Sequence, residues 1–547
     1  GKSTMTRMTG GQAIVRSLKQ YGIDTIFALP GVQLDHFFNA LYDEGNSIRA
    51  IQPRHEQGAA YMAFGYAQSS GKVGAFAVVP GPGLLNTTAA LATAYGCYAP
   101  VLAITGQLPA STIGKGYGLL HELPDQQALI AGLTKWCCYM EHPSEVPDRI
   151  REAFKQLQSG VIRPVEIEMA MDTLGVTTEL NLLDPVNGYE SPEPDGDAIE
   201  AAAKLLGKAT NPLIVCGGGA VDAGTELLEI AEMLQAPVIS HRMGRGIVSD
   251  RHYLSQTLPV GYKLWPDVDV VLVVGSRAQQ QLHVWGKDEG LQVVRIDIDP
   301  GQLVRFGRPT VGIVADAARS LASLIPALAK HNKKRASREE ELSGLESSTL
   351  AELRDALTPQ AQYIEALRDA LPEDGIFVDE LTQIGYVSRA LFPVYRPRSF
   401  LSSGYQGTLG AGFPAALGAK VANPDKPVLS INGDGGFMFN VQELATAVQH
   451  GIDVVTVVFN DGAFGNVKRM QEDDYDGRVI ASELRNPDFI RLAESFGVCA
   501  ARAETPQALR GELDKAFGRK GASFIEVPIG KVPDPWGVSL PRAKIRG

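Results

Sequence analysis

Cysteine, whose spacing can reveal disulfides or a zinc site, is scarce in this sequence. The 547 residues include only five, an odd number, at Cys97, Cys137, Cys138, Cys216 and Cys499. Their spacing is not that of metal ligands, and an odd count does not suit a disulfide framework. We therefore expect reduced thiols in a cytoplasmic protein, and a secreted disulfide scaffold is disfavoured.

Long apolar runs and an excess of positive charge are also lacking. No hydrophobic stretch approaches the roughly 18 residues that predict a transmembrane helix, and the N-terminal residues lack the apolar core of a signal peptide. The formal net charge of −11 disfavours a surface for nucleic acid. We expect a cytoplasmic protein that binds neither membrane nor nucleic acid.

The composition itself is that of a globular protein, with 44% hydrophobic and 21% charged residues. A chain of this length exceeds one hydrophobic core, which predicts three domains of about 150–200 residues each. Strand patterns alternate with helix patterns, so we predict an α/β fold of three doubly wound domains with mainly parallel sheets. Polar segments at 188–195 and 330–348 are predicted linkers. The predicted domains are residues 5–185, 195–335 and 350–547.

Two neighbouring strand patterns in the last domain each end in an aspartate. The apolar run 428–431 leads to Asp434, a helix pattern covers 441–450, and the β-branched run 454–459 leads to Asp461. Parallel strands end at one edge of a sheet, where α/β proteins bind ligands, so the two carboxylates are expected to lie together there. Magnesium prefers such oxygen ligands in combination with phosphate oxygens.

Glycines surround the first of these aspartates, in the turn Gly433-Asp434-Gly435-Gly436. They let backbone amides approach a phosphate closely, and the N-terminus of the following helix adds positive potential. Taken alone, a Gly-Asp-Gly turn is more often an ordinary β-turn than a phosphate site. The spacing to Asp461, 461 − 434 = 27 positions, is the feature that favours the second interpretation.

In the first domain, Glu56 stands at the mouth of a predicted helix that continues through Tyr66. Acids are common in the first turn of a helix because the helix dipole favours them, and this is one interpretation. The other is a buried acid that hydrogen-bonds a nitrogen of a heterocycle. The local residues leave both interpretations open.

Three further pieces of this domain are candidates for a site. They are the rigid turn VPGPGLLN at 79–86, the tetrapeptide ITGQ at 104–107 and the glycine-rich segment GYGLLHELPDQ at 116–126. His121 in the last segment is a candidate acid or base, although a lone histidine in such a loop is more often a solvated residue. His55, next to Glu56, is interpreted as structural.

Together these motifs resemble the acetolactate synthase-like branch of the thiamine diphosphate enzymes. RHEQGAAYMAFGYAQSSG, GPGLLN and ITGQ occur in that branch in this order and spacing. The stretch from Gly433 to Ala463 is similar to the thiamine diphosphate motif, which begins with Gly-Asp-Gly and ends about thirty residues later with Asn-Asn. The resemblance covers essentially the whole chain. It implies a pyrimidine-binding first domain, a middle domain and a diphosphate-binding last domain, with thiamine diphosphate and Mg²⁺ as cofactors.

The resemblance also implies roles for individual residues. Asp434, Asp461 and the backbone carbonyl of Ala463 would be the magnesium ligands, although many relatives have asparagine at the position of Asp461. Glu56 would protonate the aminopyrimidine of the cofactor, and the other catalytic candidates are His121 and Gln107. The residues implied to bind the cofactor are Pro30, Gly31, Glu56, Asn86, Thr382, Gln383, Gly407, Leu409, Gly433, Asp434, Gly435, Gly436, Asp461, Ala463, Phe464, Gly465 and Asn466. Among these, Leu409 would wedge under the cofactor and hold it bent.

The middle domain departs from the flavin-containing pattern of acetolactate synthases. After Gly275 the sequence lacks the acidic pair of those enzymes, and the region 257–267 is shortened, which disfavours flavin adenine dinucleotide. The alternatives are a vestigial fold and an adenine-nucleotide site that uses Arg277 and residues 297–299. The glycines at 217–219 are interpreted as a structural turn, because the dinucleotide pattern G-x-G-x-x-G is missing there.

Two other departures bear on the reaction. Met470 replaces the tryptophan that selects larger keto-acid acceptors in acetolactate synthases, and residues 79–81 replace the histidine of pyruvate and benzoylformate decarboxylases. We predict a carboligase that decarboxylates a pyruvate-like 2-oxo acid and joins the product to a carbonyl acceptor. The alternatives are a simple 2-oxo acid decarboxylase and a 2-hydroxyacyl lyase. In this family Glu56 and the aspartates meet across a subunit interface, which implies a homodimer or homotetramer.

Overall fold

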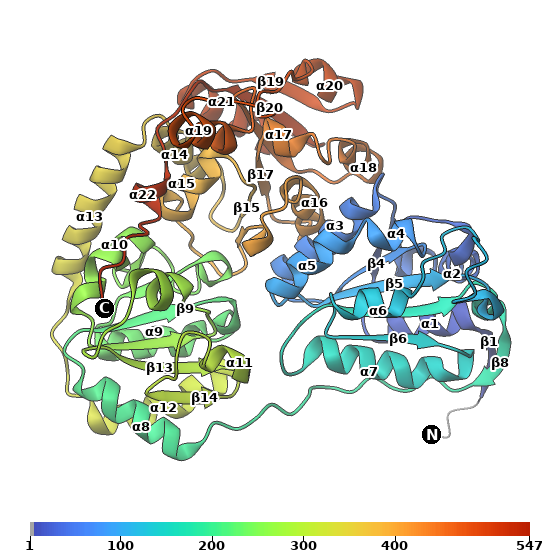
Figure 1. Cartoon of the computed structure of the whole chain (residues 1–547), viewed down its shortest axis with the longest axis horizontal. Helices are drawn as coiled ribbons and strands as arrows, with labels where there is room; N and C mark the ends of the chain where they lie inside the picture. The colour runs from blue at the N-terminus through green and yellow to red at the C-terminus, as the bar shows by residue number, and fades with distance from the viewer. Residues whose placement is uncertain (1–4) are drawn as a thin grey trace.

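The computed structural model describes residues 5–547, which form three α/β units (Figure 1). Each unit is built on a six-stranded sheet whose strands are all parallel. The predicted fold class is therefore confirmed, while the predicted limits of the three domains stay a prediction. Within the described residues, no helix is long and apolar enough to cross a membrane.

The N-terminal unit contains the first sheet and a short antiparallel pair, β1 (Thr6–Thr9) with β8 (Thr177–Leu180). From edge to edge the sheet consists of β3 (Arg49–Ile51), β2 (Thr25–Ala28), β4 (Gly74–Val78), β5 (Val101–Gln107), β7 (Val165–Ala170) and β6 (Trp136–Met140). Its helices are α1 (Gly10–Gln20), α2 (Asp35–Asp43), α3 (Glu56–Ser70), α4 (Pro82–Leu85), α5 (Thr88–Gly96), α6 (Gln126–Ala131) and α7 (Val146–Gln158).

The C-terminal unit repeats the strand order of the first sheet. From edge to edge it consists of β16 (Phe400–Leu401), β15 (Ile376–Asp379), β17 (Val428–Gly433), β18 (Val455–Asn460), β20 (Ser523–Pro528) and β19 (Cys499–Arg502). Its helices are α14 (Gln360–Ala370), α15 (Gln383–Leu391), α16 (Gly412–Ala422), α17 (Asp434–Phe437), α18 (Glu443–His450), α19 (Gly465–Asp474), α20 (Phe489–Ser495), α21 (Pro506–Phe517) and α22 (Trp536–Ser539).

The middle unit has a different order, in which the first strand lies at the centre. From edge to edge its sheet consists of β11 (Ser255–Gln256), β10 (Val238–Ser240), β9 (Pro212–Cys216), β12 (Val270–Val274), β13 (Gln292–Asp297) and β14 (Val311–Val314). Its helices are α8 (Gly196–Lys208), α9 (Gly224–Leu234), α10 (Leu258–Leu264), α11 (Pro300–Leu303) and α12 (Ala317–His331), and α13 (Glu339–Ala356) leads to the C-terminal unit.

Central strands of all three sheets are buried because helices cover both faces of a parallel sheet. Every residue of β4 and β12 is buried, as are five of the six residues of β18. This is why these segments read as continuous apolar runs in the sequence. The expected strand at 212–216 matches β9, whereas the helix expected at 441–450 begins only at Glu443.

The segment predicted as the second linker, 330–348, is largely helical, so that prediction was wrong. α12 ends at His331 and the 18-residue α13 begins at Glu339. A helix that packs against the protein along a single face can be as rich in charged residues as a linker, because most of its surface meets water. The distinguishing signal is the spacing of its buried residues, Leu342, Thr349 and Leu353.

The N-terminal and C-terminal units contact each other through α3 and α16, which lie side by side in Figure 1. Both helices are buried along most of their length and are rich in alanine and glycine. A Cβ atom at Gly65 would overlap the carbonyl oxygen of Ala415, and a Cβ atom at Gly418 would overlap the carbonyl oxygen of Met62. Glycine at these two positions therefore allows the backbones to approach closely.

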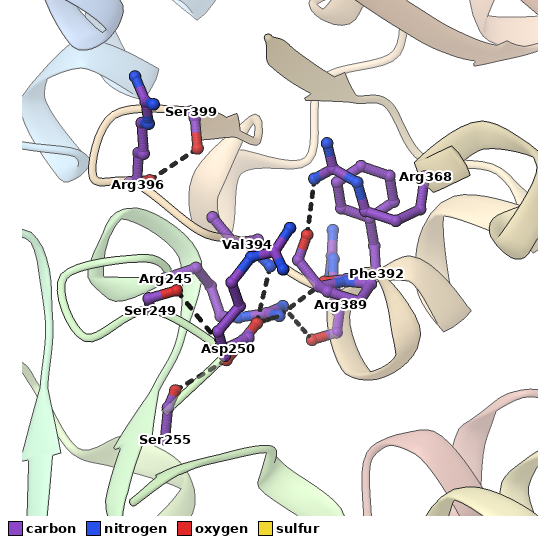
Figure 2. Close-up of polar contacts among 12 residues, drawn as sticks. Arg245, Ser249, Asp250, Ser255, Arg368, Arg389, Phe392, Val394, Arg396 and Ser399 are labelled. Atoms are coloured by element: carbon purple, nitrogen blue, oxygen red, sulfur yellow. Dashed lines mark hydrogen bonds and ion pairs between the residues drawn. The ribbon is translucent and has the colours of Figure 1, made fainter. Parts of the chain in front are cut away.

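The middle and C-terminal units are joined by the buried side chain of Arg245 (Figure 2). Its guanidinium group donates to the carbonyl oxygens of Arg389 and Phe392, each at 2.7 Å, and to the carboxylate of Asp250 at 2.9 Å. Asp250 in turn accepts the amide of Val394 at 2.8 Å. The buried charge is thus paired with a carboxylate, and both terminal nitrogens of the guanidinium group donate hydrogen bonds. Such pairing lowers the free-energy cost of burying an ion pair.

The last residues of the chain return to the middle unit. The indole N–H of Trp285 donates to the carbonyl of Pro541 at 2.9 Å, and Arg546 forms a pair with Asp288 at 2.7 Å. Arg546 also donates to the carbonyl of Trp265 at 2.9 Å. The segment after α22 therefore connects the C-terminal unit to the middle unit.

The contact between α3 and α16 predicts unequal effects for two glycine substitutions. Gly65→Ala should destabilise the protein by about 1–3 kcal/mol, because the new methyl group must displace the Ala415 carbonyl. Gly511→Ala is the matched control: it lies in α21, where a Cβ atom meets nothing within 4 Å, and should stabilise by up to about 1 kcal/mol. Thermal unfolding of both variants tests this, and equal melting temperatures would contradict the close contact.

Candidate active site

A cavity of about 390 Å³ lies at the carboxyl edge of the C-terminal sheet. It is formed where β15, β17 and β18 end and the following helices begin, which is the usual ligand position in α/β sheets. Its lining residues are Leu381, Thr382, Gln383, Tyr386, Leu409, Gly433, Asp434, Gly435, Gly436, Phe459, Asp461, Ala463, Phe464, Gly465, Asn466 and Val467. Twelve of these sixteen residues are among those implied by the family resemblance.

Asp434 and Asp461 lie next to each other in this cavity. β17 and β18 are in register, with Gly433 opposite Phe459, so the residues that follow both strands reach the same place. The amide of Asp461 donates to the carboxylate of Asp434 at 3.3 Å. Burial, and then the charge of Asp434, raises the pKa of Asp461 to about 7. Two adjoining carboxyl groups of this kind fit a divalent cation, which would relieve their mutual repulsion.

Ala463, the implied third ligand, is held beside this pair. Its amide donates to the carboxylate of Asp461 at 3.2 Å, so its position depends on the same side chain. Ala463 is buried and also forms an isolated bridge to Glu483. Oxygen donors from two side chains and one carbonyl are the set that magnesium accepts, together with phosphate oxygens.

Three glycines line the cavity at positions where a side chain would collide with neighbouring atoms. A Cβ atom at Gly435 would lie 2.6 Å from the ring of Phe464, and one at Gly436 would overlap the carboxylate of Glu380. One at Gly465 would overlap the carboxylate of Asp461. Since Gly465 also begins α19, backbone amides and a helix N-terminus face the cavity, as a diphosphate group requires. The residues present therefore fit thiamine diphosphate with a divalent cation.

Leu409 lines the cavity between two glycines with positive φ, Gly407 at 57° and Gly410 at 89°. Gly407 itself does not line the cavity, but a Cβ atom there would lie 3.2 Å from the side chain of Leu381, which does. The two left-handed positions turn the chain sharply on both sides of Leu409. This places a bulky apolar side chain in the cavity wall, as the resemblance implies.

Side chains from α19 and α22 contact residues that line the cavity. Arg469 donates to the side-chain oxygen of Gln383 at 2.6 Å, and the indole N–H of Trp536 donates to Asn466 at 2.6 Å. The ring of Trp536 also lies 4.5 Å from that of Tyr386, measured between centroids. Trp536 therefore anchors the tail against residues that line the cavity.

In the N-terminal unit, Glu56 and Asn86 lie together. Glu56 is the first residue of α3, is half-buried, and accepts a hydrogen bond from the side chain of Asn86 at 3.0 Å. Pro30 and Gly31 follow β2 at the same edge of the sheet, and a Cβ atom at Gly31 would overlap Val79. These residues belong to the carboxyl edge of the first sheet, just as Asp434 belongs to that of the last.

Gln107 and His121 are held in separate networks at this edge. Gln107 is buried at the end of β5 and donates to Glu168 at 3.3 Å, where burial raises the pKa of the carboxyl group. His121 has a φ of 69°, and its Nδ1 atom lies 3.1 Å from the side-chain oxygen of Gln33. These contacts hold the two side chains in place. Neither contact shows that Gln107 or His121 transfers a proton.

The cavity and this N-terminal group are two separate half-sites. In the part of the chain that the structure describes, no residue of the N-terminal unit lines the cavity. The structure therefore brings together the predicted residues from 382 to 466 except Gly407, but not Pro30, Gly31, Glu56, Asn86, Gln107 and His121 with them. Neither half-site alone therefore contains all of the predicted residues.

Sequence reasoning missed several residues of the cavity and its support. Asn486 donates to the carboxylate of Asp434 at 2.6 Å and to the side chain of Asn460 at 3.1 Å. Nothing in the irregular segment around Asn486 indicates this, because the contact is made 52 positions away in the sequence. Tyr386 lies three positions after Gln383, one turn along α15, so a helix predicted at that place would have indicated it.

In the middle unit, the glycine turns that follow β9 and β12 pack against each other. At the ends of β9 and β12, the amide of Gly219 donates to the carbonyl of Gly275 at 3.1 Å, and a Cβ atom at Gly217 would lie 2.5 Å from the same oxygen. Arg277 is engaged with the carbonyl of Gly96 at 2.7 Å. The glycines thus pack two loops of this chain against each other, which is consistent with the structural turn predicted at 217–219, while the lack of flavin adenine dinucleotide stays a prediction.

Comparison with known proteins identifies three matching family models. They are the thiamine pyrophosphate enzyme N-terminal TPP binding domain at residues 8–129, the central domain at residues 199–324 and the C-terminal TPP binding domain at residues 382–527. A probable 2-ketoarginine decarboxylase of Pseudomonas aeruginosa is 33% identical over 539 residues, which cover 95% of this chain and 94% of that protein.

Acetolactate synthases are similar over the same extent. A probable acetolactate synthase large subunit of Methanocaldococcus jannaschii is 34% identical, covering 95% of this chain and 92% of that protein. The acetolactate synthase isozyme 1 large subunit of Escherichia coli is 31% identical, covering 96% of this chain and 95% of that protein.

The contact of Asn486 with Asp434 leads to a testable prediction about metal binding. Asn486→Ala should weaken Mg²⁺ binding in the presence of thiamine diphosphate about 10- to 100-fold, because the amide orients the Asp434 carboxylate. Isothermal titration calorimetry measures the affinity. Asn423→Ala, which removes an asparagine that bonds Ser69 instead, is the control and should bind Mg²⁺ like the wild type. Wild-type affinity in Asn486→Ala would show that Asn486 does not orient the ligand.

Proposed function

The chain belongs to the thiamine pyrophosphate enzymes, and from this premise we propose that it is a decarboxylating carboligase of the acetolactate synthase type. It would remove carbon dioxide from a 2-oxo acid such as pyruvate and join the remaining acyl carbon to a carbonyl acceptor. The observation that carries the proposal is the cavity that combines paired carboxylates, the three closely packed glycines and Leu409. The similarity to acetolactate synthases over nearly the whole chain supports the reaction type.

The residues of the cavity would bind and orient the cofactor. Asp434, Asp461 and the carbonyl of Ala463 would hold Mg²⁺, and the amides at the start of α19 would receive the diphosphate. Leu409 would set the angle between the two rings of the cofactor. When bound, thiamine diphosphate supplies the electron sink that decarboxylation of a 2-oxo acid needs. The apolar part of the wall would exclude water from the reacting carbon.

Glu56 would hold the proton on the ring nitrogen of the cofactor's aminopyrimidine. The carboxyl group of Glu56 is half-buried at the start of α3 and also accepts a hydrogen bond from Asn86. This fixed orientation suits a hydrogen bond to the ring nitrogen. Because Glu56 does not line the cavity of its own chain, we propose that it completes the cavity of a second copy. The assembly would be a homodimer or a pair of such dimers.

A simple 2-oxo acid decarboxylase is the second candidate. It is favoured by the similarity to the probable 2-ketoarginine decarboxylase, which extends over 95% of the chain. Met470, in the middle of α19 and 44% exposed, also lacks the bulky ring of the tryptophan implied to select keto-acid acceptors. A 2-hydroxyacyl lyase would use the same residues to cleave a carbon–carbon bond, which is the reverse of the ligation.

Turnover by the purified protein with thiamine diphosphate and Mg²⁺ tests the proposal. Pyruvate and 5-guanidino-2-oxopentanoate are supplied separately, and the products are resolved by mass. Acetolactate or acetoin from pyruvate is the expected result and supports the carboligase. A decarboxylated aldehyde from the guanidino acid alone would instead favour the decarboxylase, and no cofactor binding would contradict both.

Glu56→Gln should lower kcat about 10²- to 10⁴-fold, because the amide cannot give its proton to the ring nitrogen. Asp35→Asn is the matched control. Asp35 is likewise the first residue of a helix, α2, and is exposed. If both variants kept wild-type kcat, Glu56 would be only a carboxylate favoured by a helix dipole.

A further inference from the structure

Glu443, on α18 of the C-terminal unit, reaches across to the N-terminal unit and is fully buried there. Its carboxylate accepts the backbone amide of Arg54 at 2.6 Å, and the hydroxyl of Thr446 donates to the same oxygen at 3.1 Å. Its other oxygen lies so close to Gly58 that a Cβ atom there would overlap it. A buried carboxylate is costly unless N–H groups donate hydrogen bonds to it. The contact therefore also fixes the position of the Arg54 amide.

The same segment makes a second contact with the N-terminal unit. The side-chain amide of Asn440, which is 1% exposed, donates to the side-chain oxygen of Gln57 at 3.0 Å. It also donates to the carbonyl of Gly410 at 2.7 Å, next to Leu409 in the cavity wall. Residues 440–443 thus connect the loop beside the cavity to the turn before α3.

These two contacts lie on either side of Glu56. Arg54 is two positions before it and Gln57 is one position after it, while Asn86 holds the carboxyl group itself. The turn is further shaped by His55, whose ring accepts the amide of Gln57 at 3.0 Å. Arg54 is thus held through its backbone amide and Gln57 through its side chain, which restricts the movement of Glu56 between them.

We infer that Glu443 is a positioning residue for Glu56, which it holds through the backbone amide of Arg54, with Asn440 as the second point of attachment. This inference deepens the proposed function and rests on the role proposed for Glu56. Glu443 is not among the residues that line the cavity. Its effect is on the geometry of proton transfer at the cofactor ring.

A purely structural role, in which α18 only attaches the two units to each other, makes a different prediction. The other end of α18 also contacts the N-terminal unit, where Arg49 donates to the carbonyl of His450 at 2.6 Å. Loss of this contact weakens the same interface but leaves the turn at 54–57 intact. Arg49→Ala is therefore the matched control for Glu443→Gln.

Two measurements on these variants test the inference. In the cofactor-free protein, hydrogen–deuterium exchange of the peptide that contains residues 54–58 should become at least about tenfold faster in Glu443→Gln. The Arg54 amide lies 2.6 Å from one carboxylate oxygen and 3.4 Å from the other, and glutamine keeps only one acceptor oxygen and loses the negative charge. In the protein loaded with thiamine diphosphate and Mg²⁺, exchange of the thiazolium carbon-bound proton should become about 10- to 100-fold slower. Arg49→Ala should change neither rate, and the Kd for thiamine diphosphate should be unaltered.

The possible outcomes separate the inference from the proposed function. Failure of the wild type to bind thiamine diphosphate contradicts the proposed function. Wild-type binding, with both rates in Glu443→Gln equal to those of the wild type, overturns the role of Glu443 alone. If Glu443→Gln does not fold, Gln57→Ala removes the second attachment from the N-terminal side, and unchanged rates in that variant overturn the inference. Equal changes in Arg49→Ala would also overturn it, in favour of simple attachment.

Discussion

Two carboxyl groups that adjoin each other at a buried sheet edge are the constraint on which the C-terminal unit depends. Asp434 is 1% exposed, and its charge makes ionisation of Asp461 less favourable. The fold keeps the two carboxyl groups close together because β17 and β18 end in register. Amide donors from Asp461 and Asn486 compensate only part of the repulsion. A bound cation would therefore add stability as well as function.

The sequence was a sufficient guide wherever the information is local. Central strands, the Asp434 and Asp461 turns and the start of α3 could be predicted because apolar runs and glycines report directly on backbone geometry. Asn486 and Glu443 could not, because their contacts join segments that are 52 and 389 positions apart. The helix α13 was mistaken for a linker because charge density does not distinguish a one-sided helix from a solvated chain.

The three units are connected more closely than their separate sheets suggest. Arg245 joins the middle unit to the C-terminal unit, and the tail beyond α22 joins them again through Arg546. Glu443 and Asn440 connect the C-terminal unit to the turn of Glu56. Each half-site is thus assembled with help from a neighbouring unit. Changes far from the cavity in the sequence can alter its geometry without touching any residue that lines it.

The contact between α3 and α16 is reciprocal, which bears on the symmetry of the chain. Met62 and Gly65 are separated by three positions, as are Ala415 and Gly418, and each glycine faces the carbonyl of the other pair. The two sheets also share one strand order. Such reciprocity is the mark of a twofold axis between identical subunits. The N-terminal and C-terminal units are thus related to each other as the two subunits of a homodimer are, although they lie in one polypeptide and have different sequences.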